Sequence, residues 1–75
     1  MDNYLNDENL FIKTLVYDCF GESHLIEIYF IELFNNYIML QDGYVEAVLQ
    51  TNDINTYLNY FLEMNGYKTI HPFLS

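Results

Sequence analysis

The sequence contains no arginine and only two lysines, Lys13 and Lys68, against eleven aspartate and glutamate residues, which gives a formal net charge of −9. A protein that binds nucleic acid needs basic side chains to displace the counterions of the phosphates, so this charge argues against a direct nucleic-acid binder. The same charge disfavours docking on an anionic membrane surface. Without arginine the chain also lacks the side chain that clamps phosphate or carboxylate groups through two parallel hydrogen bonds.

Cysteine and long hydrophobic runs are equally scarce. The one cysteine, Cys19, excludes an intramolecular disulfide framework, and its apolar neighbours predict a buried structural thiol. The uncharged stretch that follows Glu32, residues 33–41, is far shorter than the roughly 20 apolar residues that cross a bilayer. The N-terminus has neither the basic region nor the apolar region of a signal peptide, so we expect a cytoplasmic protein.

The residues that are abundant predict a folded chain. Hydrophobic residues make up 52% of the sequence and aromatic residues 19%, which is far richer than an acidic disordered tail. The length of 75 residues predicts one acidic domain spanning residues 1–75. A domain of this size buries only ~60% of its unfolded surface, so its stability is expected to be marginal.

The first candidate element, residues 4–19, is expected to be a helix. Asp7 provides an N-cap, and Gly21 ends the element. The residues that sit at helical spacing are Leu10, Phe11, Thr14 and Leu15. The second half of this segment, residues 11–17, is rich in residues that favour strands, so a strand is the alternative.

The middle of the chain predicts antiparallel strands. Residues 23–34 fit either a strand or a helix, because alternate positions and helical positions are both apolar. A turn is expected at Asn35 and Asn36. The runs 37–41 and 44–50 flank Asp42 and Gly43, and an Asp-Gly pair between two such runs predicts a β-hairpin because both residues tolerate positive φ.

The last third of the chain predicts a helix over residues 53–65. Its apolar stripe consists of Ile54, Tyr57, Leu58, Phe61 and Leu62. Thr51 or Asp53 caps the start, and the Asn-Gly pair at 65–66 supplies a left-handed stop. The competing interpretation is a strand over 57–63 that turns at the same Asn-Gly pair into 67–70. The predicted fold class is therefore α+β, with an N-terminal helix, a small antiparallel sheet containing the Asp-Gly hairpin, a C-terminal helix and a short tail.

Residues suited to metal binding or catalysis are few. The two histidines, His24 and His71, lie far apart without the spacing of a zinc site, so His24 is expected to be a surface residue of a strand and His71 a residue of the tail. Nucleophilic chemistry at Ser23 or Cys19 would need a positioned base. There is no glycine-rich phosphate loop, and a chain this small has little volume for a substrate pocket. We therefore expect no metal, no cofactor and no enzymatic activity.

The acidic residues themselves are the strongest functional signal. A net charge of −9 exceeds the roughly 2–8 that suits a small domain, and self-repulsion of these charges costs stability. A strongly negative protein associates fast with a positive one, and nucleic-acid-binding grooves are the commonest strongly positive surfaces in a cell. The hypothesis is DNA mimicry, in which carboxylates occupy the positions of phosphates. It predicts that one contiguous face holds most of Glu22, Glu27, Glu32, Asp42, Glu46 and Asp53.

The order of motifs resembles that of the uracil-DNA glycosylase inhibitors, because Glu22 and Ser23 follow the first candidate helix and an acidic-hydrophobic segment comes next. Small, acidic, aromatic-rich chains without arginine also resemble anti-CRISPR proteins of phages and mobile elements. The resemblance implies an inhibitor of a host DNA-acting enzyme, whose Glu-Ser edge contacts the DNA-binding site while an apolar pocket takes an apolar side chain of the enzyme. The expected partner-binding residues are Glu22, Ser23, Glu27, Glu32, Asp42 and Glu46.

Two alternatives remain open from the sequence. An acidic adaptor or antitoxin-like module would bind a basic protein without competing with nucleic acid. A homodimer is a third hypothesis, because eight tyrosines and six phenylalanines exceed what a small core needs, so that some of these rings could cover a second copy of the chain.

Overall fold

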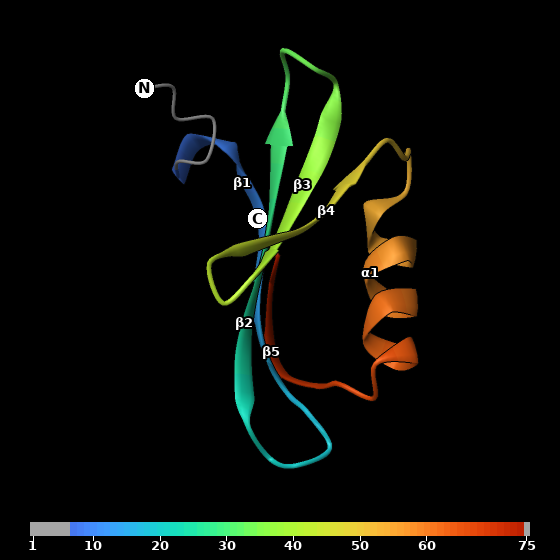
Figure 1. Ribbon diagram of the computed structural model, residues 1–75. Coiled ribbons are helices and arrows are strands. Elements are labelled where there is room, and N and C mark those ends of the chain that lie inside the picture. The colour runs from blue at the N-terminus through green and yellow to red at the C-terminus, as the bar shows by residue number, and fades with distance from the viewer. Residues whose placement is uncertain (1–6, 75) are drawn as a thin grey trace.

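A computed structural model describes residues 7–74 of the chain, with side chains described as far as Thr69. Its strands form one antiparallel sheet in the order β4-β3-β2-β1-β5, and a single helix packs against one face of that sheet (Figure 1). The elements of residues 7–74 are η1 (Asp7–Asn9, a 3-10 turn), β1 (Leu10–Tyr17), β2 (Ser23–Ile31), β3 (Asn36–Gln41), β4 (Tyr44–Leu49), α1 (Ile54–Met64) and β5 (Lys68–Leu74).

The predicted N-terminal helix is wrong within the described residues. Asp7 begins only the short turn η1, and the following residues form β1. In β1 the side chains of Ile12, Thr14 and Val16 are buried and their neighbours are exposed, which is the two-residue alternation of a strand. The strand preference of this segment wins because β1 is the central partner of both β2 and β5, so its backbone is hydrogen-bonded along both edges. Residues 4–6 of the predicted helix lie outside the described residues.

The strand interpretation of residues 23–34 is confirmed by β2, and the predicted hairpin is confirmed by β3 and β4. Asp42 and Gly43 both have positive φ, 55° and 88°, as a tight hairpin turn requires. Between β2 and β3 the left-handed residue is Asn35, with φ of 52°. Asparagine is one of the few residues other than glycine that visit this conformation routinely.

The predicted C-terminal helix is confirmed by α1. The carboxylate of Asp53 accepts a hydrogen bond from the backbone N–H of Thr56 at 3.1 Å, so the N-cap is Asp53 and not Thr51. Gly66 follows the helix with φ of 70°, the left-handed stop that the sequence predicts. The helix buries Ile54, Leu58 and Leu62 against the sheet.

The tail that was expected after the helix is instead a strand, β5. It pairs with β1 in antiparallel register, from Tyr17 opposite Lys68 to Ile12 opposite Leu74. This pairing joins segments more than fifty residues apart, and local sequence pattern carries no information about such a contact. The observed class is therefore a five-stranded antiparallel sheet with one helix between the fourth and fifth strands of the described chain.

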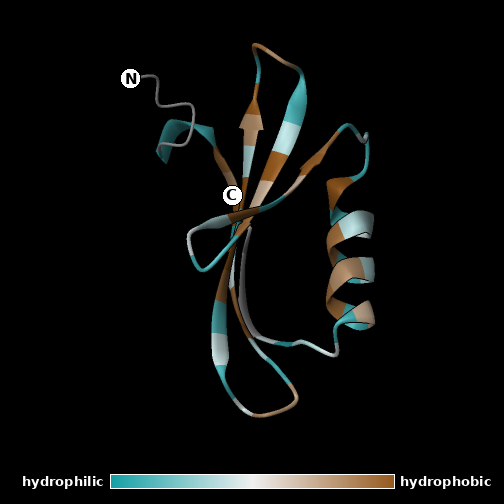
Figure 2. Cartoon of the chain, in the orientation of Figure 1, coloured by the Kyte–Doolittle hydropathy of each residue, from teal (hydrophilic) through white to brown (hydrophobic). Residues whose placement is uncertain are grey.

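The main hydrophobic core lies between α1 and the sheet. Strands β1, β2 and β3 contribute side chains that are at most 1% exposed, and α1 contributes its apolar stripe. The core residues are Ile12, Val16, Ile26, Ile28, Met39, Ile54, Leu58 and Leu62. Figure 2 shows hydrophobic residues along the strands and on the side of α1 that faces them. This side of the sheet therefore supplies most of the burial that stabilises the fold.

The opposite side of the sheet, which we call the open face, is also apolar. Side chains at its centre pack on one another in a second cluster made of Leu10, Tyr29, Ile31, Ile38 and Leu40. Around them Leu15 is 37% exposed, and Val45 and Val48 are each 59% exposed. In the described part of the chain α1 covers only the other side, so the open face presents aliphatic side chains to solvent.

Candidate functional site

Two turns meet at the end of the sheet where β1 passes into β2. The first turn contains Asp18, and the second contains Asp42. The imidazole of His24, near the start of β2, lies between them. Its Nε2 is 2.9 Å from Oδ2 of Asp18, and its Nδ1 is 2.7 Å from Oδ2 of Asp42. We call this group of three residues the His24 clamp, because one ring connects both turns.

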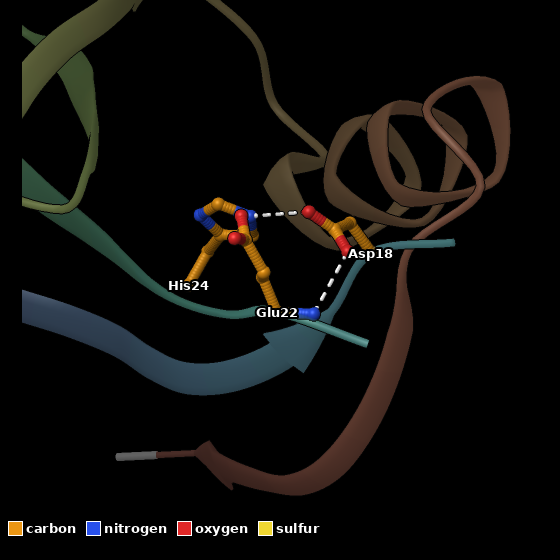
Figure 3. A group of neighbouring side chains, drawn as sticks. All are labelled: Asp18, Glu22 and His24. Carbon is orange, nitrogen blue, oxygen red and sulfur yellow. Dashed lines mark hydrogen bonds and ion pairs between the residues drawn. The ribbon is translucent and has the colours of Figure 1, made fainter. Parts of the chain in front are cut away.

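Backbone hydrogen bonds hold each carboxylate in place. Oδ1 of Asp18 accepts from the N–H groups of Phe20 and Glu22, at 2.8 and 2.9 Å, which closes the first turn over its own side chain. Figure 3 shows the bond from Glu22. Oδ1 of Asp42 accepts from the N–H of Leu25 at 2.9 Å. Each carboxylate therefore uses one oxygen to order the backbone and the other to contact His24.

The ring of His24 also packs against an aromatic side chain. The rings of His24 and Tyr67 are stacked with centroids 5.5 Å apart, and Tyr67 precedes β5. The hydroxyl of Tyr67 accepts a hydrogen bond from the side-chain amide of Gln41 at 3.2 Å. The clamp thus connects β1, β2, β3 and the approach to β5 at one end of the sheet.

The geometry of the clamp requires a protonated His24. An imidazolium donates from both ring nitrogens, whereas a neutral ring has one nitrogen that can only accept, and a carboxylate offers it no proton. The hydrogen bonds to Asp18 and then Asp42 raise the pKa of His24 above its ordinary value of 6.5. The hydrogen bond from His24 correspondingly lowers the pKa of Asp18 and of Asp42 below the ordinary 3.8.

The signs of these shifts define a pH window. A raised histidine pKa stabilises the fold below the unfolded value of 6.5, and that contribution is lost as pH rises through the folded pKa. Lowered aspartate pKa values stabilise the fold above 3.8, and that contribution is lost as pH falls through the folded values. The clamp therefore stabilises the chain most between the ordinary pKa values of its carboxylates and of its imidazole.

Among the described residues, Asp18, Glu22 and His24 form the group that could hold a metal ion, since each offers one ligand atom and these atoms lie within 4.8 Å of one another (Figure 3). A metal would need the lone pair of a neutral imidazole. In the clamp both ring nitrogens already face carboxylate oxygens at hydrogen-bond distance. The arrangement therefore fits an internal ion pair better than a metal site.

Of the six predicted partner-binding residues, three gather at this end of the sheet. Glu22 is exposed in the first turn, Ser23 is exposed at the start of β2, and Asp42 lies in the second turn. The register places Ser23 opposite Tyr17, which is 44% exposed. This end of the sheet therefore combines carboxylates with an exposed aromatic ring.

Two further predicted residues lie toward the middle of the sheet. Glu27 is on the open face, where the register places it between Lys13 and Leu40, and it accepts a hydrogen bond from the hydroxyl of Tyr29 at 3.2 Å. Glu46 is exposed in the edge strand β4, at the irregularity in its pairing with β3. The carboxylates of this half of the sheet therefore lie around the apolar open face.

The remaining predicted acids lie elsewhere. Glu32 is in the turn between β2 and β3, at the opposite end of β2 from the clamp. Asp53 caps α1, and its carboxylate is engaged by Thr56 through both the backbone N–H and the hydroxyl. These two residues do not join the group formed by Glu22, Asp42 and their neighbours.

Three expectations about individual residues are corrected. Cys19 is exposed in the β1–β2 turn and not buried, because the turn carries it away from the sheet. His24 is not an isolated surface residue, since its side chain is only 18% exposed and bonded on both sides. His71 lies in β5 and not in a tail, opposite Leu15, and its side chain is outside the described part of the structure.

The hollows of the surface are lined by residues with little acid-base chemistry. One, of about 540 Å³, is lined by Phe30, Asn35, Tyr37, Gln50, Thr51 and Asn52. Another, of about 310 Å³, is lined by Ile12, Thr14, Asn55, Leu58, Asn59, Leu62 and Thr69. Neither lining contains an aspartate, glutamate, histidine or cysteine, so neither places a general acid or base beside a bound molecule.

Among the residues that the structure describes, no helix is both long enough and apolar enough to cross a bilayer. The chemistry of the surface therefore depends on the open face, the acids beside it and the His24 clamp. No protein-family model, curated protein or solved structure matches this chain.

Proposed function

We propose that this chain is a binding protein of the inhibitor type, which covers the nucleic-acid site of a basic host protein in the cytoplasm. The observation that carries the proposal is the open face, an apolar sheet surface with carboxylates beside it. Val45 and Val48 are more than half exposed there, Glu46 lies in the same strand β4, and Glu27 lies on the same face in β2. Exposed aliphatic groups flanked by charge are typical of a surface that binds another protein.

The sign of the charge supports a basic partner. The chain carries a formal charge of −9, and its two lysines, Lys13 opposite Glu27 and Lys68 opposite Tyr17, are far outnumbered by the carboxylates. Electrostatic attraction would accelerate encounter with a positive surface, and like charges would oppose it with a second copy of the chain. Charge therefore favours a basic partner over a homodimer at this face.

A nucleic-acid site is the basic surface that fits best. Glu22 and Asp42 at the end of the sheet, with Glu27 and Glu46 toward its middle, would meet the basic side chains that otherwise contact phosphates. The exposed ring of Tyr17 and the aliphatic groups beside it would supply contact area.

An acidic adaptor that leaves the nucleic-acid site free is the second candidate, and one observation favours it. The carboxylates of Asp18, Asp42 and Asp53 accept hydrogen bonds from within the chain. Carboxylates already bonded internally have fewer lone pairs left for a partner's basic groups. An adaptor would rely on the apolar open face and use the acids mainly for attraction at a distance.

The proposal predicts salt-sensitive capture of a basic protein. Immobilised chain should retain such a protein from a bacterial lysate at low salt and release most of it as salt rises, because screening weakens attraction between surface charges. Quantitative mass spectrometry of the eluates measures the release. Bovine serum albumin or another acidic protein of unrelated sequence on the same resin controls for nonspecific attraction. Retention that albumin reproduces, or that salt leaves unchanged, would contradict the proposal.

A further inference from the structure

We propose that protonated His24 acts as a pH-dependent latch, which holds the β1–β2 turn to the β3–β4 turn and releases the β3–β4 turn when its proton is lost. The proposal concerns the chain alone, so it stands or fails independently of any partner. It starts from the two contacts of one ring, 2.9 Å from Nε2 to Asp18 and 2.7 Å from Nδ1 to Asp42.

The groups that face His24 from each neighbouring element make the protonated ring the stable form. The first turn brings the carboxylates of Asp18 and Glu22, whose ligand atoms lie close to the ring, and the second brings Asp42. From the approach to β5 comes the neutral ring of Tyr67, and β1 places the apolar Val16 opposite His24. No lysine is recorded in contact with the ring among the described residues, so the described charges around it all favour its proton.

Loss of the proton would break one contact selectively. A neutral imidazole keeps one N–H, and its other nitrogen directs a lone pair at the second carboxylate. The lone pair and the carboxylate oxygen repel each other. Asp18 is held by two backbone N–H groups, those of Phe20 and Glu22, and its side chain is 16% exposed. Asp42 is held by one, that of Leu25, and is 46% exposed. The neutral ring therefore keeps its N–H on Asp18, and Asp42 moves into solvent.

The release has a defined structural consequence. Asp42 connects the hairpin to β2 through its side chain, which accepts from the N–H of Leu25, and through its own N–H, which donates to the carbonyl of Leu25 at 2.8 Å. When the carboxylate leaves, the side-chain bond to Leu25 is lost and the hairpin turn is held to β2 by the remaining backbone bond. The first turn keeps both bonds to Asp18, so the two ends of the latch respond differently to pH.

The direct test is an NMR titration of the whole chain from about pH 5 to pH 8, the range in which histidine changes charge, and upward until the ring signals are constant. We expect His24 to titrate above 6.5, and the amide proton of Leu25 to shift upfield with the same midpoint. The amide of Glu22 should keep its hydrogen-bonded shift. A His24 midpoint at or below 6.5, or equal responses of the two amides, would overturn the latch.

Matched variants separate the latch from other titrating groups. Asp42→Asn keeps the left-handed turn and an acceptor oxygen but removes the charge, so it should lower the midpoint of His24. Glu46→Gln removes the same charge from an exposed position in β4 and should leave the midpoint nearly unchanged. If both variants shift the midpoint equally, the effect is one of net charge and the proposed contact is wrong.

Stability provides a second readout. Urea unfolding of the natural chain should show a midpoint that falls as pH rises through the His24 titration. His24→Gln should remove this dependence, and His71→Gln, which removes the other histidine, should retain it. If His24→Gln does not fold, the NMR titration of the natural chain still tests the proposal. Persistence of the same pH dependence in a folded His24→Gln protein would contradict the proposal.

Discussion

Replacing Ile28 with alanine is expected to remove a large part of the free energy of unfolding of the protein. Ile28 is fully buried in β2, in the core between the sheet and α1. Truncating a buried isoleucine to alanine typically costs about 2–5 kcal/mol, since burial is lost and a cavity remains. Native domains are stable by only about 5–15 kcal/mol, and a domain of this length lies toward the lower end of that range. The measurement is urea unfolding followed by circular dichroism.

Val48→Ala is the matched control for this experiment. It also truncates an aliphatic side chain on a strand of the same sheet, but Val48 is 59% exposed on the open face. Substitutions at exposed positions usually change stability by no more than about 0.5 kcal/mol. Equal losses in the two variants would mean that the core does not lie between α1 and the sheet, which would contradict the fold described above.

The second large effect is expected from Val48→Lys, which should reduce capture of the basic partner at least tenfold. The substitution places a positive charge among the aliphatic groups of the open face, where it would repel a basic partner and be desolvated on binding. Pull-down against a series of bait concentrations, analysed by quantitative mass spectrometry, measures the loss. Circular dichroism checks that the variant stays folded.

Tyr60→Lys is the control that separates the effect of where the lysine is placed from the effect of the added charge. Tyr60 is also 59% exposed, but it lies on α1, on the other side of the sheet from the open face. Both variants change the net charge by the same amount, so long-range attraction falls equally in the two. If Tyr60→Lys weakens capture as much as Val48→Lys, the partner responds to net charge only and the open face is not its binding surface.

The parts of the fold that the sequence predicts are those decided by neighbouring residues. The positive φ of Asp42 and Gly43 is a local preference, and it produces the predicted hairpin. The α1 stripe and its stop at Gly66 are likewise local patterns. These elements are therefore predictable from local sequence patterns alone.

The parts that the sequence missed depend on distant pairing. Residues 10–17 contain both a helical and an alternating apolar pattern, and the choice was made by hydrogen bonds to β2 on one edge and β5 on the other. Pro72 favours a tail by local rules, yet an edge strand tolerates the missing N–H of proline. The local sequence pattern therefore does not decide the conformation of the N-terminal and C-terminal segments, although both form strands in the structure.

The candidate site divides in the same way. Composition predicts that the acids form the functional surface, but their grouping depends on register, which brings Asp42 beside residues near position 24 and leaves Glu32 at the other end of β2. The sequence does not predict the contacts of His24, because Asp18 and Asp42 come from different turns and neither has a diagnostic sequence spacing to His24. The Asp-Gly turn supplies one of these carboxylates, Asp42, but placing it beside His24 requires knowledge that β2 pairs with β3.

Competition with nucleic acid tests the central claim most directly. The captured partner, purified and loaded with a fluorescently labelled DNA or RNA that it binds, is titrated with the natural chain while fluorescence anisotropy reports the bound nucleic acid. We expect the natural chain and Tyr60→Lys to displace the nucleic acid, and Val48→Lys to displace it at least tenfold more weakly. Formation of a ternary complex, with the nucleic acid still bound at saturating concentrations of the chain, would contradict the claim and favour the adaptor.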